Sequence, residues 1–240
     1  MGTSKLFAKY YLDKSDWIDG TTEYHNILRK YIDDSHKILE LGSGPTNRTT
    51  QLLKNLGKTV YGLDIDKRVL ANQHLDFKFV YEGKEFPPEL KKVKFNVITC
   101  DYVMEHVEFP VIMLKEISDS LDEGGLFIFR TPNKYHYVSL ISRFTPHGFH
   151  LLVANYVRRT PIDQVEPYPT FYRFNSEFTV KKVTYSFGLR LKQIAFVEKE
   201  PSYFRFNAFF FAIGILYERV VNSSKLFKHL RANIFVVVQK

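Results

Sequence analysis

The sequence predicts an α/β domain built on a parallel β-sheet. An apolar run over 36–41 is broken by Gly42 and Gly44 and followed by helix-compatible residues, which is typical of a strand, a tight turn and a helix start. A second apolar run over 59–63 follows that helix directly, and a strand–helix–strand order implies a parallel βαβ unit. The chain has 240 residues, 45% of them hydrophobic, which suits one such domain with an added subdomain.

The glycine turn is a candidate ligand site. Glycines let the backbone approach a ligand closely, and the N–H groups of the following helix favour negative charge such as a carboxylate. A pyrophosphate-binding fingerprint needs a third glycine where this chain has Asn47, and Pro45 removes an N–H donor. Asp64 ends the second strand, where a carboxylate can accept hydrogen bonds from ribose hydroxyls. The pattern therefore favours a nucleoside without pyrophosphate.

The other expected elements follow from periodicity and from turn and cap residues. An apolar stripe predicts a helix over 22–32, capped by Thr21 or Thr22. The next helices are expected over 47–56, over a short stretch capped by Asp66, from Pro110 to Leu121, and from Asn175 or Ser176 to Phe187. The third to seventh strands are expected over 77–81, 95–100, 126–130 (after Gly124 and Gly125), 189–197 and 233–238.

Three segments are predicted as additions to this sheet within one domain, 1–240. Residues 1–35 form an N-terminal helical segment, and 201–231 form an apolar helical insertion. Residues 134–174 combine histidines, arginines and aromatic residues, and we interpret them as an inserted cap over the active site, because long connections often carry function. The alternative is an insertion that only covers apolar surface.

Composition limits the possible partners and compartment. The net charge of +8 permits attraction to phosphate groups, although an excess of this size is more often an ordinary solvated surface. The single cysteine, Cys100, excludes an internal disulfide. The first fifteen residues interleave lysines with aromatic residues and lack the apolar core of a signal peptide, so a cytoplasmic protein is expected.

Four segments together resemble the class I S-adenosylmethionine-dependent methyltransferases. Glu-Leu-Gly-Ser-Gly at 40–44 resembles their glycine-rich first motif, and Tyr-Gly-Leu-Asp-Ile-Asp at 61–66 resembles their ribose-binding second motif. Residues 100–107 and 121–133 are similar to the fourth-strand and fifth-strand segments of small-molecule members. The resemblance implies a Rossmann-like sheet of seven strands with the last one antiparallel, helices on both faces, and S-adenosylmethionine as cofactor.

The resemblance also implies the cofactor residues. The glycine turn would surround the methionyl part, Asp64 would bind the ribose, and Glu40 would reach toward the amino group. A turn after the third strand would flank the adenine, although a plain solvated turn is equally compatible with its sequence. The complete expected set is Glu40, Gly42, Ser43, Gly44, Asp64, Ile65, Glu82, Gly83, Asp101 and Tyr102.

Methyl transfer is a displacement in which positioning dominates, and a hydroxyl acceptor benefits from a base. Histidine is the side chain best suited to that task near neutral pH. His136, close to the end of the fifth strand, is the first choice, followed by His106 and His147; each can instead be a packed structural histidine. The expected acceptor-binding residues are Arg143, His150, Tyr172 and Arg173.

No metal is expected. Some members of the resembled family have Glu-x-x-Glu-His here and bind a divalent metal, but Tyr102 replaces the first glutamate in this chain. The remaining Glu105 and His106 cannot alone provide an oxygen-rich six-coordinate site.

The predicted function is methyl transfer to a small molecule or to a glycan or secondary-metabolite intermediate, most simply on oxygen. One alternative is a nucleic-acid methyltransferase, whose Asp/Asn-Pro-Pro-Tyr/Phe motif does not match 100–103; another is a cofactor-binding scaffold without activity. The apolar run over 204–221 is too short to span a bilayer. Because cations flank it, we expect a mostly buried helix whose exposed edge contacts a membrane surface weakly or forms a homodimer.

Overall fold

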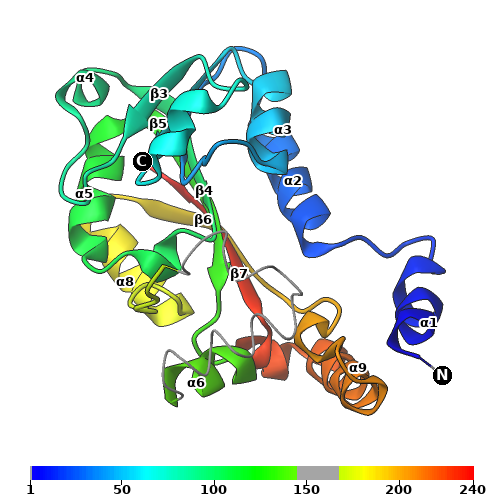
Figure 1. The fold of residues 1–240 in the computed structure, drawn as a ribbon. Helices are drawn as coiled ribbons and strands as arrows, with labels where there is room; N and C mark the ends of the chain where they lie inside the picture. The colour runs from blue at the N-terminus through cyan, green and yellow to red at the C-terminus, as the bar shows by residue number, and fades with distance from the viewer. Residues whose placement is uncertain (1, 145–167) are drawn as a thin grey trace. The chain divides into compact units, whose positions relative to one another are not determined.

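The computed structural model describes residues 2–144 and 168–240. Within this part of the chain, one sheet has the strand order β3-β2-β1-β4-β5-β7-β6 (Figure 1). Its strands are β1 (Lys37–Leu41), β2 (Thr59–Asp64), β3 (Phe77–Val80), β4 (Phe95–Asp101), β5 (Leu121–Pro132), β6 (Arg190–Val197) and β7 (Asn233–Gln239).

The strand directions confirm the predicted sheet. β1 pairs in parallel with β2 and with β4. β2 also pairs in parallel with β3, and β4 with β5. The last strand is antiparallel to β5, because the Gly124 N–H donates to the Lys240 carbonyl at 3.2 Å and the Lys240 N–H donates to Gly125 at 3.0 Å. The carboxyl ends of the first four strands therefore meet at one edge of the sheet.

Helices lie on both faces, with α2 and α3 on one and α5 and α8 on the other (Figure 1). The helical segments are α1 (Thr3–Phe7), η1 (Ala8–Leu12), α2 (Gly20–Tyr31), α3 (Arg48–Leu56), η2 (Lys67–Ala71), α4 (Pro88–Lys91), η3 (Met104–His106), α5 (Pro110–Ser120), α6 (Tyr137–Phe144), α8 (Glu177–Ser186), η4 (Ser202–Phe204), α9 (Ala208–Ser223) and η5 (Lys225–Leu230).

Two of the three expected helix caps are present: the side chains of Asp66 and Ser176 each accept a hydrogen bond from a backbone N–H in the first turn of the helix that follows. Asn47, expected as the first residue of a helix, instead caps α3 in the same way. The predicted cap of α2 was wrong. This helix begins at Gly20, so the side chain of Asp19 accepts from the Thr22 N–H at 2.7 Å in place of a threonine cap.

The fifth strand is longer than predicted. It begins at Leu121, which pairs with Phe95, and it includes the two glycines that were expected to precede it. The register shifts between Phe95 and Val97, and Gly124 adopts a φ of +78°. An irregularity of this kind accommodates extra residues without ending the strand. The two glycines, which by sequence would end the preceding helix, therefore lie within β5.

The chain forms two compact units. Unit 1 comprises Met1–Glu23, Asn133–Pro169 and Phe196–Asn233, and unit 2 comprises Tyr24–Pro132, Thr170–Ala195 and Ile234–Lys240. Unit 2 holds the first five strands and their core, in which Ile38, Leu39, Val97, Ile98, Phe127 and Phe129 are buried. In unit 1, Tyr11 of η1 packs with Phe211 and Ile215 of α9.

Candidate functional site

The turn between β1 and α3 requires its two glycines. Gly42 and Gly44 have φ values of +75° and +56°, in the left-handed region that favours glycine. A Cβ at Gly42 would lie 2.3 Å from Val103 Cγ2, whereas a Cβ at Gly44 would meet no atom within 4 Å. The turn is thus closely packed against the segment after β4 on one side and open on the other.

Side chains hold the turn in this shape. Asn47 Nδ2 donates to the Ser43 carbonyl at 2.8 Å, and the fully buried Asn72 donates through Nδ2 to the Gly44 carbonyl at 3.0 Å. The Ser43 side chain is also fully buried, and within the described part of the chain its Oγ has no hydrogen-bond partner. This hydroxyl lies inside the protein, because a Cβ at Gly62 of β2 would be 2.6 Å from it, so the turn is held rigidly from its buried side.

Asp64 lies at the end of β2, beside the turn. Its Oδ2 accepts from the Gly44 N–H and its Oδ1 from the Asp66 N–H, both at 2.7 Å. Each carboxylate oxygen can accept a second hydrogen bond, so this fixed carboxylate can still receive two hydroxyl donors. Its geometry fits the predicted ribose contact.

The expected adenine neighbours lie beyond the adjacent strand ends. Asp64 pairs with Val80 of β3, and the neighbouring Ile65 exposes 48% of its surface. Glu82 and Gly83 are exposed in the turn after β3, where Gly83 has a φ of +85°. An exposed aliphatic side chain and an open turn provide room for a flat ring.

Glu40 is a buried carboxyl group under the glycine turn. It accepts from Thr50 Oγ1 at 2.6 Å, and Asn47 Nδ2 lies 3.5 Å from its other oxygen. Burial raises its pKa to about 7, against the effect of the Thr50 and Asn47 hydrogen bonds. A cation bound beside it would favour the ionised form.

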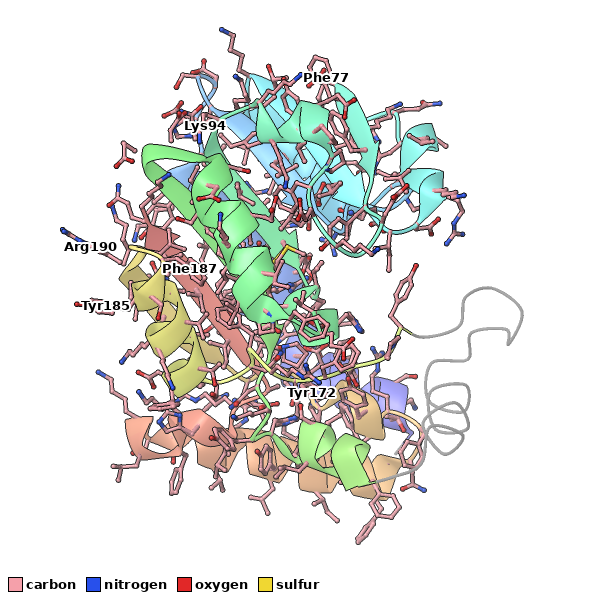
Figure 2. All side chains as sticks on the ribbon, turned by 90° about the vertical axis from the view of Figure 1, so that its left-hand side faces the viewer. Phe77, Lys94, Tyr172, Tyr185, Phe187 and Arg190 are labelled. Carbon is pink, nitrogen blue, oxygen red and sulfur yellow. The ribbon has the colours of Figure 1, made fainter. Side chains whose placement is uncertain are left out.

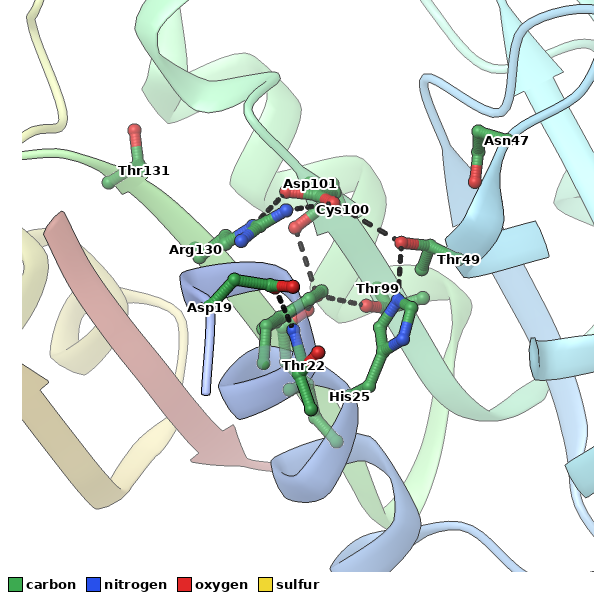
Figure 3. Close-up of polar contacts among 12 residues, drawn as sticks. Asp19, Thr22, His25, Asn47, Thr49, Thr99, Cys100, Asp101, Arg130 and Thr131 are labelled. Carbon is green, nitrogen blue, oxygen red and sulfur yellow. Dashed lines mark hydrogen bonds and ion pairs between the residues drawn. The ribbon is translucent and has the colours of Figure 1, made fainter. Parts of the chain in front are cut away.

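Asp101, at the end of β4, is held by an ion pair with Arg130 of β5 (Figure 3). Arg130 Nη2 donates to Asp101 Oδ2 at 2.8 Å and its Nε donates to Oδ1, which is the bidentate arrangement. Thr49 Oγ1 also donates to Oδ2 at 3.2 Å and lies 3.1 Å from His25 Nε2 (Figure 3). Burial, followed by the nearby Arg48 and Arg130, lowers the pKa of His25.

Aromatic rings enclose the Arg130 guanidinium, which is 4% exposed. It lies 4.5 Å from the ring centroid of Tyr102 and 5.1 Å from that of Tyr24, both within cation–π range. Tyr102 adopts a φ of +56°, a strained backbone conformation of the kind that concentrates at functional sites. Tyr102 was expected at the site, but Arg130 and Tyr24 were not, although an arginine within an apolar strand does indicate a buried partner.

Glu105 and His106 form a second polar group, in η3. Thr131 Oγ1 donates to Glu105 Oε2 at 3.2 Å, and Asn175 Nδ2 in turn donates to Thr131 at 2.5 Å. Burial raises the pKa of Glu105 to about 7. The His106 side chain is 32% exposed, and its Nε2 lies 3.9 Å from Glu105 Oε1.

The first-choice base, His136, is placed differently. It belongs to unit 1, is 3% exposed, and contacts the rings of Tyr137 and Tyr217. Its Nε2 lies 3.4 Å from Glu198 Oε2, and burial lowers the pKa of the imidazole to about 4. This imidazole is enclosed by its own unit and therefore poorly placed to meet an acceptor.

The predicted acceptor residues are only partly described. Arg173 Nη1 donates to the Glu108 carbonyl at 2.7 Å, and its guanidinium lies 5.3 Å from the Phe171 ring centroid. Tyr172, labelled in Figure 2, has a φ of +50°. Its backbone N–H donates to the Glu105 carbonyl at 3.3 Å. His147 and His150 lie outside the described residues, as does the side chain of Arg143 in α6.

The charge at this edge of unit 2 is predominantly negative. Asp64 and Asp101 each act to raise the pKa of Glu40, and Asp101 acts in the same direction on Glu105. Arg130 offsets only part of this charge. Such a field favours a cationic ligand. Across residues 2–144 and 168–240, no group of three or more histidine, cysteine or acidic side chains is placed to hold a metal ion.

Comparison with known proteins gives a family. A model described as a methyltransferase domain matches residues 14–183, which is more than half of the chain. The ubiquinone biosynthesis O-methyltransferase of Glaesserella parasuis is 29% identical over 109 residues, covering 41% of this chain and 46% of that protein. The enzyme of the same name from Shewanella sp. is 27% identical over 146 residues, which cover 53% of this chain and 61% of that protein. The matched part thus spans about half of these curated relatives.

Solved structures share the fold. An S-adenosylmethionine-dependent methyltransferase from Mesorhizobium loti has a TM-score of 0.56 at 12% identity, covering 91% of this chain and 96% of that one. A methyltransferase of the same kind from Archaeoglobus fulgidus has a TM-score of 0.52 at 15% identity, with 99% of both chains covered. The family model covers more than half of the chain, and its match agrees with the fold and with the glycine turn after β1: the chain belongs to the methyltransferase domain family.

Proposed function

We propose that this enzyme methylates a hydroxyl oxygen of a small molecule or of a glycan or secondary-metabolite intermediate. The Glu105–His106 pair carries this proposal, because it puts a partly exposed imidazole beside a buried carboxyl group at the edge that holds the glycine turn. The two curated relatives, whose names specify O-methylation, support the same chemistry.

The cofactor residues have separate roles in this proposal. Gly42, Ser43 and Gly44 surround the methionyl part, Glu40 attracts the ammonium group, and Asp64 accepts from the ribose hydroxyls. Ile65, Glu82 and Gly83 flank the adenine, and Asp101 and Tyr102 border the methionine side. When bound, the sulfonium supplies an activated methyl group. The protein contributes position and a negative field that favours the cation.

We infer that His106, and not His136, is the preferred base. The Gly42 backbone is packed against Val103, and the His106 N–H donates to the Val103 carbonyl at 2.9 Å. His106 is therefore one short helical turn away from the residue that contacts the glycine turn. His106 would accept the acceptor's hydroxyl proton as the hydroxyl oxygen takes the methyl group and the methyl–sulfur bond of the bound cofactor breaks. Glu105, which accepts a hydrogen bond from Thr131, has Oε1 3.9 Å from His106 Nε2, and its ionised carboxylate favours the imidazolium that results.

Replacing His106 with alanine tests this role. We expect turnover to S-adenosylhomocysteine with hydroxylated aromatic acids or sugars to fall at least about 100-fold, since positioned bases typically contribute this much. His36→Ala is a matched control, because His36 precedes β1 at the opposite edge of the sheet. Full turnover by His106→Ala from acid to alkaline pH would exclude His106 as the base, and the same measurement on His136→Ala then tests the alternative.

The proposal also includes a partner and a compartment. The proposed partner is a small-molecule or glycan acceptor, bound with the help of Tyr172 and Arg173 of unit 2, in the cytoplasm. The segment 204–221 is proposed as a peripheral contact, either to a membrane or to a second copy of the chain.

A further inference from the structure

Helix α9 carries apolar residues on two opposite sides, and only one of them is covered; the helix is thus less buried than the sequence predicted. Phe211, Gly214, Ile215, Glu218 and Val221 face inward and are buried. At 100° per residue, Phe209, Ile213, Leu216 and Val220 form a stripe on the opposite side, and these residues are 69%, 46%, 64% and 47% exposed. A helix that is hydrophobic all round normally lies in a core or meets a membrane.

The exposed surface extends beyond the helix. Phe206 and Phe210 are exposed and have ring centroids 5.9 Å apart, and Phe210 lies 5.6 Å from Phe209. Leu226 and Leu230 of η5 are exposed as well, Leu226 by 87%. We define the α9 face as these exposed apolar residues: Phe206, Phe209, Phe210, Ile213, Leu216, Val220, Leu226 and Leu230. Exposed apolar side chains gathered on one helix and on the segments next to it indicate an interaction surface.

The segment that carries the α9 face is basic. From 201 to 232 the sequence contains one acid, Glu218, and its side chain is buried. Arg205 and Lys225 are exposed in the same stretch, as is Arg219, whose Nε lies 3.5 Å from Glu218 Oε2. Arg205 lies over the Phe7 ring at 4.0 Å from the centroid. A second copy of the chain would present the same positive charge, so self-association would oppose like charges, whereas an anionic surface would complement them.

We propose that the α9 face docks on an anionic lipid surface. α9 has 16 residues, and none of the described helices is long and apolar enough to cross a membrane, so the helix lies in the plane of the interface. Its phenylalanine and leucine side chains enter the boundary between headgroups and acyl chains, while the flanking cations contact lipid phosphates. This inference does not depend on the acceptor or on the base proposed above.

Flotation of the full-length protein with vesicles tests the proposal. We expect binding to vesicles of phosphatidylcholine mixed with phosphatidylglycerol, little binding to phosphatidylcholine alone, and a decrease at high salt. The double variant Phe209→Glu and Leu216→Glu should lower binding at least about tenfold, since two charges replace the inserted side chains. Phe178→Glu is a matched control on α8, because Phe178 is 74% exposed and belongs to unit 2.

Two further measurements separate the alternatives. S-adenosylmethionine binding by calorimetry should be the same for the wild type, the double variant and the control, which shows that each is folded and isolates the surface effect. Analytical ultracentrifugation without lipid should show a monomer. Equal flotation of the double variant and the wild type, absence of flotation by the wild type, or a dimer that the double variant dissociates would overturn the proposal.

Discussion

At the carboxyl edge of the sheet, two acidic residues are kept from ionising by burial, while a third is held ionised by an arginine. Glu40 and Glu105 are buried carboxyl groups whose pKa values are raised to about 7, while Asp101 is paired with Arg130. Burial alone disfavours ionised carboxylates, so these groups are held ready for a ligand that brings positive charge. In the cofactor site proposed above, the amino group of S-adenosylmethionine supplies it to Glu40.

The pKa of Glu40 predicts how stability depends on pH. Between the ordinary carboxyl pKa and about pH 7, the unfolded chain releases this proton and the folded chain keeps it. Stability from this group therefore falls as pH rises through that window. Glu40→Gln cannot ionise and should be up to about 3 kcal/mol more stable than the wild type at pH 8, with no gain at pH 4. Urea denaturation at both pH values measures this, and an equal difference at the two would contradict the assignment.

The Asp101–Arg130 pair predicts a non-additive double variant. Arg130→Met leaves a carboxylate without its buried partner and should destabilise the protein by about 3–5 kcal/mol. Adding Asp101→Asn removes the uncompensated charge and should restore most of that loss. Thermal unfolding of both single variants and the double variant gives the coupling energy. Additive losses would show that the pair is not coupled in the folded protein.

Among the elements, the position of the turn between β1 and α3 could be predicted, but the distant side chains that hold it by hydrogen bonds could not. Gly42, Gly44 and Asp64 follow from local turn and strand-end patterns. Asn72, which holds the turn from 28 residues away in sequence, does not, because its contact depends on the packing of η2. Tyr24 similarly fits a core stripe in sequence, yet its hydroxyl lies 2.6 Å from Thr99 Oγ1 and donates to the Cys100 carbonyl.

The two glycines of this turn should differ in their response to alanine. Both require a left-handed backbone, which costs a residue with a Cβ about 1–2 kcal/mol. Only Gly42→Ala also collides with Val103, so it should destabilise more than Gly44→Ala. Val103→Ala removes the colliding methyl groups and should recover part of the Gly42→Ala loss. Urea midpoints of the four variants test this, and identical effects of the two glycine variants would contradict the observed packing.

For the whole molecule, the positions of the strands and the first parallel βαβ unit could be predicted from local patterns, whereas the antiparallel direction of the last strand was expected only from the family resemblance. The separation into two compact units could not, since unit 1 is assembled from three segments far apart in sequence. His136 shows the consequence. Its position near the end of β5 suggested a catalytic base, but folding of unit 1 surrounds it with Tyr137, Tyr217 and Glu198.

Calorimetric titration with S-adenosylmethionine most directly tests the central claim that the glycine turn and Asp64 form the cofactor site. Asp64→Ala removes a charged acceptor, and hydrogen bonds to charged groups contribute about 1.5–3 kcal/mol, so affinity should fall roughly tenfold to a hundredfold. Asp66→Ala is the matched control, because its carboxylate in the same loop binds Arg68. We predict weakened binding for Asp64→Ala and unchanged binding for Asp66→Ala; equal affinity of Asp64→Ala and the wild type would contradict the account.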